Sequence, residues 1–364
     1  NETLLKVIAQ GGVSVRADAG ARDAPGTGTG TGLFRSEEEE RGWGWALNGK
    51  LDSALDPERP VGAPGRYPNF LRLDPDGSDS PEHAPNRDGT INLTWGSEPK
   101  GFNFLLENYA TLSDECQLYV ADAPANRHRV RPSSFNWAPA LCWRVEVSPD
   151  YREYTLFFRK DAVWQPPSFD VRKYPHLEGK FPVTAHDLKF SLDIILDKQS
   201  NLAVMRSYLD QLEGVEVVDD YTAVVRWKST VFVSLANTLG ATILPRHVYA
   251  HDENGEPYPP ETVGQQFNDH WFDRLRVGPI ACGPYRFVEY RPNQFVRLER
   301  WDDWYGFKDQ PLYPVRVRHL RIYQESETAM NWLYAGDVDV QPMNSTRYRE
   351  WVLEGDSIGK NPFK

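Results

Sequence analysis

Short segments of alternating apolar and polar residues recur from residue 90 onward, and they constrain the fold more than any other feature of the sequence. In residues 90–95, Ile91, Leu93 and Trp95 alternate with polar neighbours, as in a β-strand with one buried face. The same reasoning predicts strands over residues 142–147, 154–159, 215–218, 222–227, 285–290, 295–300 and 315–322. Because turn residues separate several consecutive segments, we expect β-hairpins.

Two helices are predicted among these strands. Thr184 occupies an N-cap position with Asp187 three residues later, and the apolar face that follows consists of Leu188, Leu192, Ile195 and Leu196. A second helix is expected over about residues 327–335, ending at Gly336. Isolated helices among hairpins indicate an α+β fold rather than a regular βαβ array.

Residues 1–89 differ in composition from the rest. Glycine and threonine alternate over residues 26–32, glutamates fill residues 37–40, and proline, aspartate and glycine are dense over residues 52–88. Such a composition buries too little apolar surface to offset the entropy of ordering. We therefore predict a flexible tether, with a short element near residues 43–51 docking on the main body.

Charge and apolar content exclude several protein classes. The net charge of −11 argues against nucleic-acid binding, because neutralising phosphates requires a surplus of lysine and arginine. No apolar run approaches the roughly 18 residues of a membrane span. Three cysteines permit at most one disulfide, and Cys116 could pair with Cys142 or both could be free. Aromatic residues in predicted loops indicate either a ligand cleft or the closure of a large sheet.

Motifs that would indicate catalysis are incomplete. Residues 44–50 have the glycine and lysine spacing of a P-loop, but Leu51 stands where a hydroxyl is required. His247 and His251 are four residues apart, which would suit two metal ligands on one helix face, but the expected glutamate after His247 is replaced by Val248. We interpret the two histidines as local helix surface.

Six segments resemble, in order, the family 5 extracellular solute-binding proteins, which are the oligopeptide- and dipeptide-binding components of ABC importers. They are TINLTWGSEPKGFN (90–103), CWRVEVSPDYREYTLFFRKDAVW (142–164), FPVTAHDLKFSLDIILD (181–197), ILPRHVYA (243–250), GPIACGPYRFVEYRPNQFVRLERWDDWYG (278–306) and VRHLRIYQESETAMNWLYAGDVDV (317–340). The resemblance covers roughly residues 90–345. Three departures stand out: Cys282 replaces a usual threonine, residues 164–181 form a long insertion, and the chain ends at Lys364 where the family continues into a second lobe.

The resemblance implies a periplasmic-binding-protein-like, two-lobed mixed sheet with hairpins, of the class II-like type and present here incompletely. The implied domains are a tether over 1–89, a solute-binding domain over 90–345 with an inserted subdomain at about 110–215, and the start of a missing C-terminal lobe over 346–364. A hinge is expected near residues 215–218 and 315–322.

The implied function is the capture of oligopeptides or similar small solutes in a cleft and their delivery to ABC transporter permease subunits. Such a protein is periplasmic or otherwise extracytoplasmic, with a possible membrane tether, and acts as a monomer without a cofactor or enzymatic activity. Alternatives are a sugar- or nickel-chelate-binding member, a truncated interaction module, or a metal-dependent hydrolase using His247 and His251.

Carried over by motif, the ligand-binding residues are expected to be Glu98, Phe102, Asn103, Tyr119, Cys282 and Gly283. Glu98 could pair with a cationic ligand group and Phe102 could pack on the ligand, while Cys282 and Gly283 would lie at the lobe crossover. Structural alternatives are a turn carboxylate for Glu98, a core aromatic for Tyr119 and a backbone turn for Gly283. Replacing Glu98 or Phe102 by alanine is expected to weaken binding with little loss of thermal stability.

Overall fold

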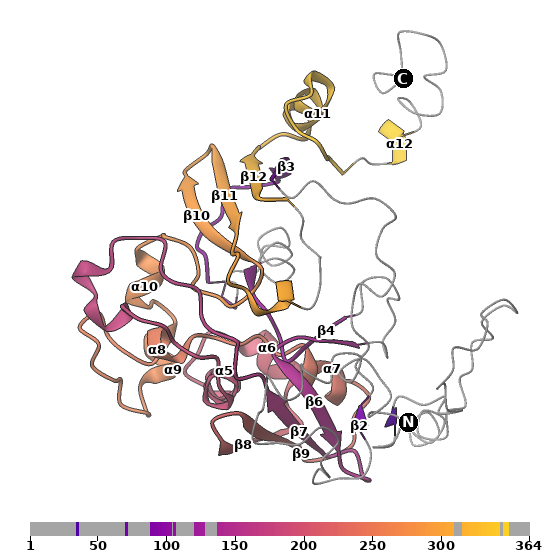
Figure 1. Ribbon diagram of the computed structural model, residues 1–364, viewed down its shortest axis with the longest axis vertical. Coiled ribbons are helices and arrows are strands. Elements are labelled where there is room, and N and C mark those ends of the chain that lie inside the picture. Colours follow the sequence, from indigo (N-terminus) through magenta and orange to yellow (C-terminus); the bar gives the residue numbers. More distant parts are fainter. Residues whose placement is uncertain are drawn as a thin grey trace, which may run out of the picture.

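A computed structural model of the 364-residue chain describes residues 34–35, 70–71, 88–103, 105–106, 120–127, 137–308, 315–342 and 345–348 (Figure 1). The predictions made for residues 26–32, residues 43–51, Cys116 and Tyr119 lie outside these ranges. Among the described residues, none of the helices is long and apolar enough to cross a membrane.

The larger sheet has six strands in the order β1-β2-β6-β7-β9-β8, all antiparallel to their neighbours. Their bounds are β1 Phe34–Arg35, β2 Phe70–Leu71, β6 Cys142–Val147, β7 Glu153–Phe158, β8 Leu212–Asp219 and β9 Thr222–Trp227. Every residue of β6 is buried, so both faces of this central strand are covered. The strands predicted here are confirmed to within a few residues at their ends. The turn at Asp219 and Asp220 joins β8 to β9, as expected.

The smaller sheet has the order β10-β11-β12-β3, so it joins residues 90–95 to strands formed by residues 285–322. Its strands are β10 Tyr285–Arg291, β11 Phe295–Arg300, β12 Val317–Ile322 and β3 Thr90–Trp95. β3 pairs in parallel with β12, from Thr90 opposite Val317 to Trp95 opposite Ile322. Strand β3 belongs to the same sheet as β10, β11 and β12. In the sequence, however, strands β6 to β9 of the six-stranded sheet lie between β3 and β10. A separate hairpin is formed by β4 Ala125–Arg127 and β5 Trp137–Pro139.

Helix α5, Ala185–Leu196, begins as predicted. Asp187 accepts hydrogen bonds from the backbone N–H of Thr184 (2.8 Å) and from its hydroxyl (3.1 Å), completing a capping box. Helix α11, Ser326–Ala335, ends at Gly336 in the left-handed conformation, also as predicted. The other described helices are α6 Ala203–Tyr208, α7 Ser234–Leu239, α8 Arg246–Tyr249, α9 Val263–Phe267, α10 Trp271–Arg274 and α12 Ser345–Tyr348, with short 3₁₀ turns η2 Val171–Lys173, η3 Pro175–Leu177 and η4 Tyr305–Lys308.

Figure 1 shows the four-stranded sheet and α11 toward one end of the molecule and the six-stranded sheet toward the other, with α8, α9 and α10 at the side. One apolar cluster is continuous through these parts, with members in both sheets and in α5. The insertion over residues 164–181 packs on α10, since the ring of Tyr174 stacks on Trp271 at 4.9 Å. The predicted hinge segment 215–218 lies in β8, an outer edge strand, and therefore does not link the two sheets.

Candidate functional site

The loop that follows β3 is held by the β10–β11 hairpin. The carboxylate of Glu98 accepts a short hydrogen bond from the hydroxyl of Tyr290 at one oxygen and a 2.8 Å bond from the backbone N–H of Asn293 at the other. Asn293 has φ +57°, as the turn between the two strands requires. Glu98 is therefore a turn carboxylate bound within the chain, in line with the structural alternative considered for it.

Phe102 lies on the same hairpin from the inside. Its side chain is 3% exposed, and its ring centroid lies 4.7 Å from that of Phe287 and 4.9 Å from that of Tyr290, in edge-to-face contacts. Because this ring is part of the core, replacing it by alanine should lower stability. That differs from the sequence-based expectation of a change in binding alone.

Asn103 fixes the end of the loop. Its side-chain amide donates to Asp273 on α10 at 2.9 Å, and its carbonyl oxygen accepts from the backbone N–H of Leu105 at 3.1 Å. Asp273 in turn accepts a 2.7 Å bond from the hydroxyl of Tyr249, and this bond contributes to a pKa of Tyr249 raised chiefly by burial. The structure thus brings the half-buried Glu98 and the buried Phe102 and Asn103 together as the supports of one loop.

Cys282 and Gly283 belong to a different contact, against residues 120–122. The backbone N–H of Gly283 donates to the carbonyl of Val120 at 2.9 Å, and the side chain of Gln165 donates to the carbonyl of Gly283 at 2.9 Å. A side chain at Gly283 would place its Cβ 2.5 Å from the Val120 oxygen, so only glycine fits. Burial raises the pKa of the Cys282 thiol well above its usual range, which makes this cysteine an inert core residue.

Asp122, in the segment that contacts Gly283, is a buried polar residue. Its carboxyl accepts from Asn126 at 2.7 Å and, through a short bond, from the hydroxyl of Tyr305. Burial raises the pKa of Asp122, with these hydrogen bonds acting in the opposite direction. The guanidinium of Arg159 lies 4.2 Å from the Tyr305 ring centroid. Only the tertiary structure could reveal these partners, because Asp122 and Tyr305 are far apart in sequence.

The two histidines considered as metal ligands do not share a helix face. α8 ends at Tyr249, and His251 follows it in a bridge with Pro257. His247 stacks on Phe181 at 4.0 Å with an interplanar angle of 8°, and burial lowers its pKa to about 3. The interpretation as local helix surface is therefore wrong for His251, which lies outside the helix, whereas His247 lies on α8 but is half-buried against Phe181. Within the part of the chain that the structure describes, no group of three or more His, Cys, Asp and Glu side chains could hold a metal ion.

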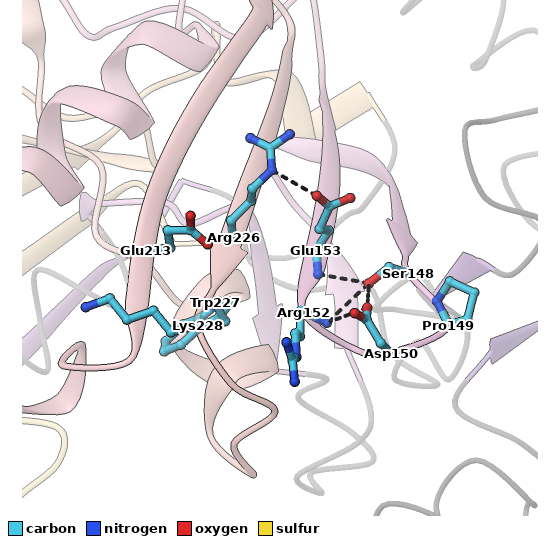
Figure 2. Close-up of a pocket in the computed structure, with 9 residues that line it drawn as sticks. All are labelled: Ser148, Pro149, Asp150, Arg152, Glu153, Glu213, Arg226, Trp227 and Lys228. Carbon is cyan, nitrogen blue, oxygen red and sulfur yellow. Dashed lines mark hydrogen bonds and ion pairs between the residues drawn. The ribbon is translucent and has the colours of Figure 1, made fainter.

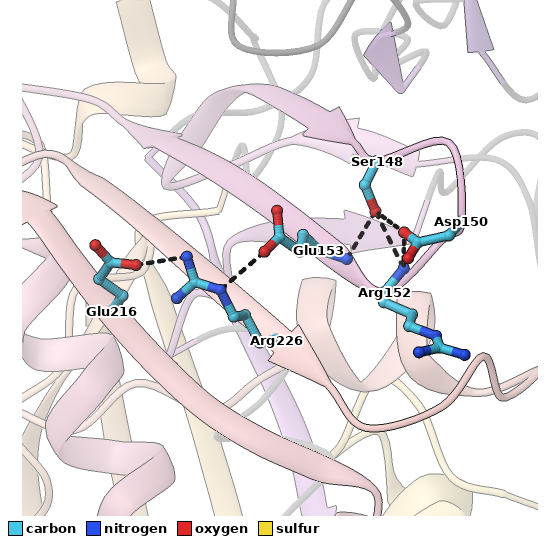
Figure 3. A network of polar contacts seen from close by, with 6 residues as sticks. All are labelled: Ser148, Asp150, Arg152, Glu153, Glu216 and Arg226. Atoms are coloured by element: carbon cyan, nitrogen blue, oxygen red, sulfur yellow. Dashed lines mark hydrogen bonds and ion pairs between the residues drawn. The ribbon is translucent and has the colours of Figure 1, made fainter.

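A hollow of about 430 Å³ lies elsewhere, beside the turn between β6 and β7 (Figure 2). Its lining consists of Ser148, Pro149, Asp150, Arg152, Glu153, Glu213, Arg226, Trp227 and Lys228. Figure 3 shows its main ionic network, in which Arg226 lies between Glu153 at 2.9 Å and Glu216 at 2.5 Å. Ser148 bonds to Asp150 at 2.6 Å and closes the turn. These contacts join neighbouring strands, and we interpret the network as cross-strand support.

Comparison with known proteins gives the evolutionary context. Residues 136–354, more than half of the chain, match the family model described as "Bacterial extracellular solute-binding proteins, family 5 Middle". The chain is 24% identical over 241 residues to the periplasmic oligopeptide-binding protein OppA of Haemophilus influenzae, an alignment that covers 62% of this chain and 36% of that protein. It thus spans well under half the length of the curated relatives that it matches.

Solved structures share the fold. The periplasmic binding protein DppA of Helicobacter pylori, in complex with the peptide STSA, superposes with a TM-score of 0.57 at 19% identity, covering 75% of this chain and 50% of that one. NikZ of Campylobacter jejuni, in complex with Ni(L-His), superposes with a TM-score of 0.53 at 17% identity, covering 75% and 46%. The expected fold class is confirmed: the chain has a family 5 binding-protein fold of mixed sheets and helices, and it covers about half of each of these solved chains.

Proposed function

The chain belongs to the family 5 bacterial extracellular solute-binding proteins of ABC transporters, and from this premise we propose that it captures oligopeptides or similar small solutes and delivers them to permease subunits. The observation that supports this most is the loop over residues 96–103. Hydrogen bonds of Glu98 and Asn103 hold it at the end of β3, beside the hairpin of β10 and β11. A loop that is held in place before the ligand arrives loses little conformational entropy on binding.

The proposed mechanism is physical rather than chemical. An extended peptide satisfies its main chain with protein N–H and C=O groups, so that its sequence matters little. Its side chains enter hydrated pockets, where water fills the remaining space. Closure of two lobes around the solute would then signal loading to the permease.

In this proposal Glu98, Phe102 and Asn103 support the loop, while Gly283 and Cys282 fix the junction with residues 120–122. Tyr119 remains a proposed ligand contact next to that junction. The domain division also remains a proposal: a tether over 1–89, a solute-binding domain over 90–345 with a subdomain at about 110–215, and the beginning of a further lobe over 346–364. We further propose that the protein acts outside the cytoplasm, as a monomer and not as an enzyme.

A different ligand class is the second candidate. The fold shared with NikZ, which was solved with Ni(L-His), shows that this architecture accommodates solutes other than peptides. Because likeness at this identity reports the fold alone, the ligand must be determined directly.

Native mass spectrometry of the purified chain tests the proposed function. Adducts that resolve into short peptides, or that appear on incubation with a peptide mixture, would support peptide capture. Adducts of a metal chelate or a sugar would support the second candidate. A chain that stays bare with every class of solute would contradict the proposal that these residues hold ligand.

A further inference from the structure

Arg276 has an unusual backbone conformation immediately after α10. Its φ is +54°, a region that non-glycine residues rarely enter and that is enriched at ligand-binding sites. Its backbone N–H donates to the carbonyl of Asp273 at 3.2 Å, which continues the turn of the helix. The conformation directs the side chain toward the loop over residues 96–103, as its contacts show.

The guanidinium of Arg276 is held in place by that loop. Its Nη2 donates to the carbonyl of Pro99 at 2.9 Å and to the hydroxyl oxygen of Tyr290 at 3.3 Å, and its carbon lies 5.6 Å from the Tyr290 ring centroid. The residue as a whole is exposed. Among the residues that the structure describes, neither Nε nor Nη1 has a hydrogen-bonding partner. A fixed cation therefore presents unused donors to solvent.

The neighbouring acids are already engaged. Both oxygens of Glu98 accept hydrogen bonds from Tyr290 and Asn293, and Asp273 accepts from Asn103 and Tyr249. The sequence suggested that Glu98 pairs with a cationic ligand group, but in the structure both of its oxygens are bound within the chain. Of these three side chains, Arg276 is the one with hydrogen-bond donors, its Nε and Nη1, left for a ligand.

We propose that Arg276 is a carboxylate-binding site at the rim of the loop over residues 96–103, and that it selects solutes carrying an anionic carboxyl group. This rests on the proposed function of solute capture. A guanidinium forms strong, charge-assisted hydrogen bonds to carboxylates. Because its position is fixed by Pro99 and Tyr290 before binding, little side-chain entropy is lost when the carboxylate arrives.

The carboxylate could be the C-terminus of a peptide or an acidic side chain, and three tripeptides separate these sources. They are trialanine with a free C-terminus, trialanine amide, and alanyl-glutamyl-alanine amide. Dissociation constants are measured by calorimetry for the wild type, R276Q and R274Q. Arg274 is a matched control, because it is also exposed but pairs with Asp269 at 3.2 Å.

For the wild type and R274Q we expect the free acid to bind about tenfold more tightly than the amide. In R276Q this ratio should fall to about one. General damage to the loop would weaken both peptides together and leave the ratio unchanged. If only the glutamyl amide binds about tenfold more tightly than trialanine amide, the site binds an acidic side chain. If only the free acid does so, the site binds the C-terminus.

Two results would overturn the inference. Equal binding of all three peptides by the wild type would show that no carboxylate is recognised, although solute capture would stand. An acid preference that R276Q retains would place the carboxylate site elsewhere. If none of the three peptides binds the wild type, while the mass spectrum also shows no adduct, the proposed function itself fails.

Discussion

Lowering the pH from about 7.5 to about 5 should destabilise the protein through His247. This ring stacks on Phe181 at 4.0 Å and lies 6.0 Å from Trp164, and burial, together with His251 and His176, lowers its pKa to about 3. In the unfolded chain a histidine has a pKa of about 6.5. The unfolded state therefore binds a proton first as the pH falls, and stability is lost below about pH 6.5.

The magnitude follows from the difference between the two pKa values. At pH 5 the imidazole is almost fully protonated in the unfolded chain and neutral in the folded one, a difference worth about 2 kcal/mol. The loss grows to roughly 4 kcal/mol near pH 3, where the folded state also begins to bind the proton. His270, whose pKa burial lowers to about 4, should add a similar amount at pH 5.

The variant H247F isolates this contribution, because phenylalanine keeps an aromatic ring on Phe181 but cannot be protonated. Urea unfolding at the two pH values, followed by tryptophan fluorescence, should show that H247F loses about 2 kcal/mol less than the wild type between pH 7.5 and pH 5. H186Q is the control for the removal of a histidine as such, since His186 lies exposed on α5. An H247F protein with the wild-type pH dependence would refute the reasoning.

Three further substitutions test the supports of the site. G283A should lose about 1–3 kcal/mol of stability, because the new Cβ would lie 2.5 Å from the backbone oxygen of Val120; a denaturant midpoint equal to the wild type would show that this backbone can move aside. F102A should lose about 3–5 kcal/mol and E98A about 1–3 kcal/mol, with binding falling in step; weakened binding at unchanged melting temperature would instead make them direct ligand contacts. D187A should lower the free energy of unfolding by at least about 1–2 kcal/mol, as for a lost helix cap, because the Asp187 carboxylate accepts from the backbone N–H groups of both Thr184 and Arg246. Thermal unfolding followed by circular dichroism measures this loss, and an unchanged melting temperature would contradict the capping role.

Much of the secondary structure follows from the sequence because the interactions that specify it are local. The capping box of Thr184 and Asp187 spans three residues, and the left-handed Gly336 ends α11 where glycine alone costs little. Strands β6, β9 and β11 match their predicted bounds, and in β11 the buried Val296 and Leu298 alternate with less buried neighbours, as the pattern predicts. The same local reading fails for His247 and His251, because their spacing suits a long helix while α8 has a single turn.

The roles of the site residues were decided by contacts between distant parts of the chain. The loop residues 97–103 were identified by resemblance, yet the partners of Glu98 lie 192 and 195 residues away, on a hairpin whose pairing with the loop no local pattern encodes. Arg276 had no signal in the sequence at all, because its positive φ and its contacts with Pro99 and Tyr290 exist only once α10 packs beside β10.

The sequence by itself therefore determined where strands β3 and β6 to β12 and helices α5 and α11 form, and to which family the motifs belong. The tertiary structure alone decided that β3 pairs in parallel with β12, that Glu98 is bound inside the chain, and that a fixed cation stands at the rim. The physical reason is the range of the interactions. Hydrogen bonding within a turn and alternation along a strand are set by neighbouring residues. The charge and shape of a site depend instead on which segments, distant in sequence, pack against each other.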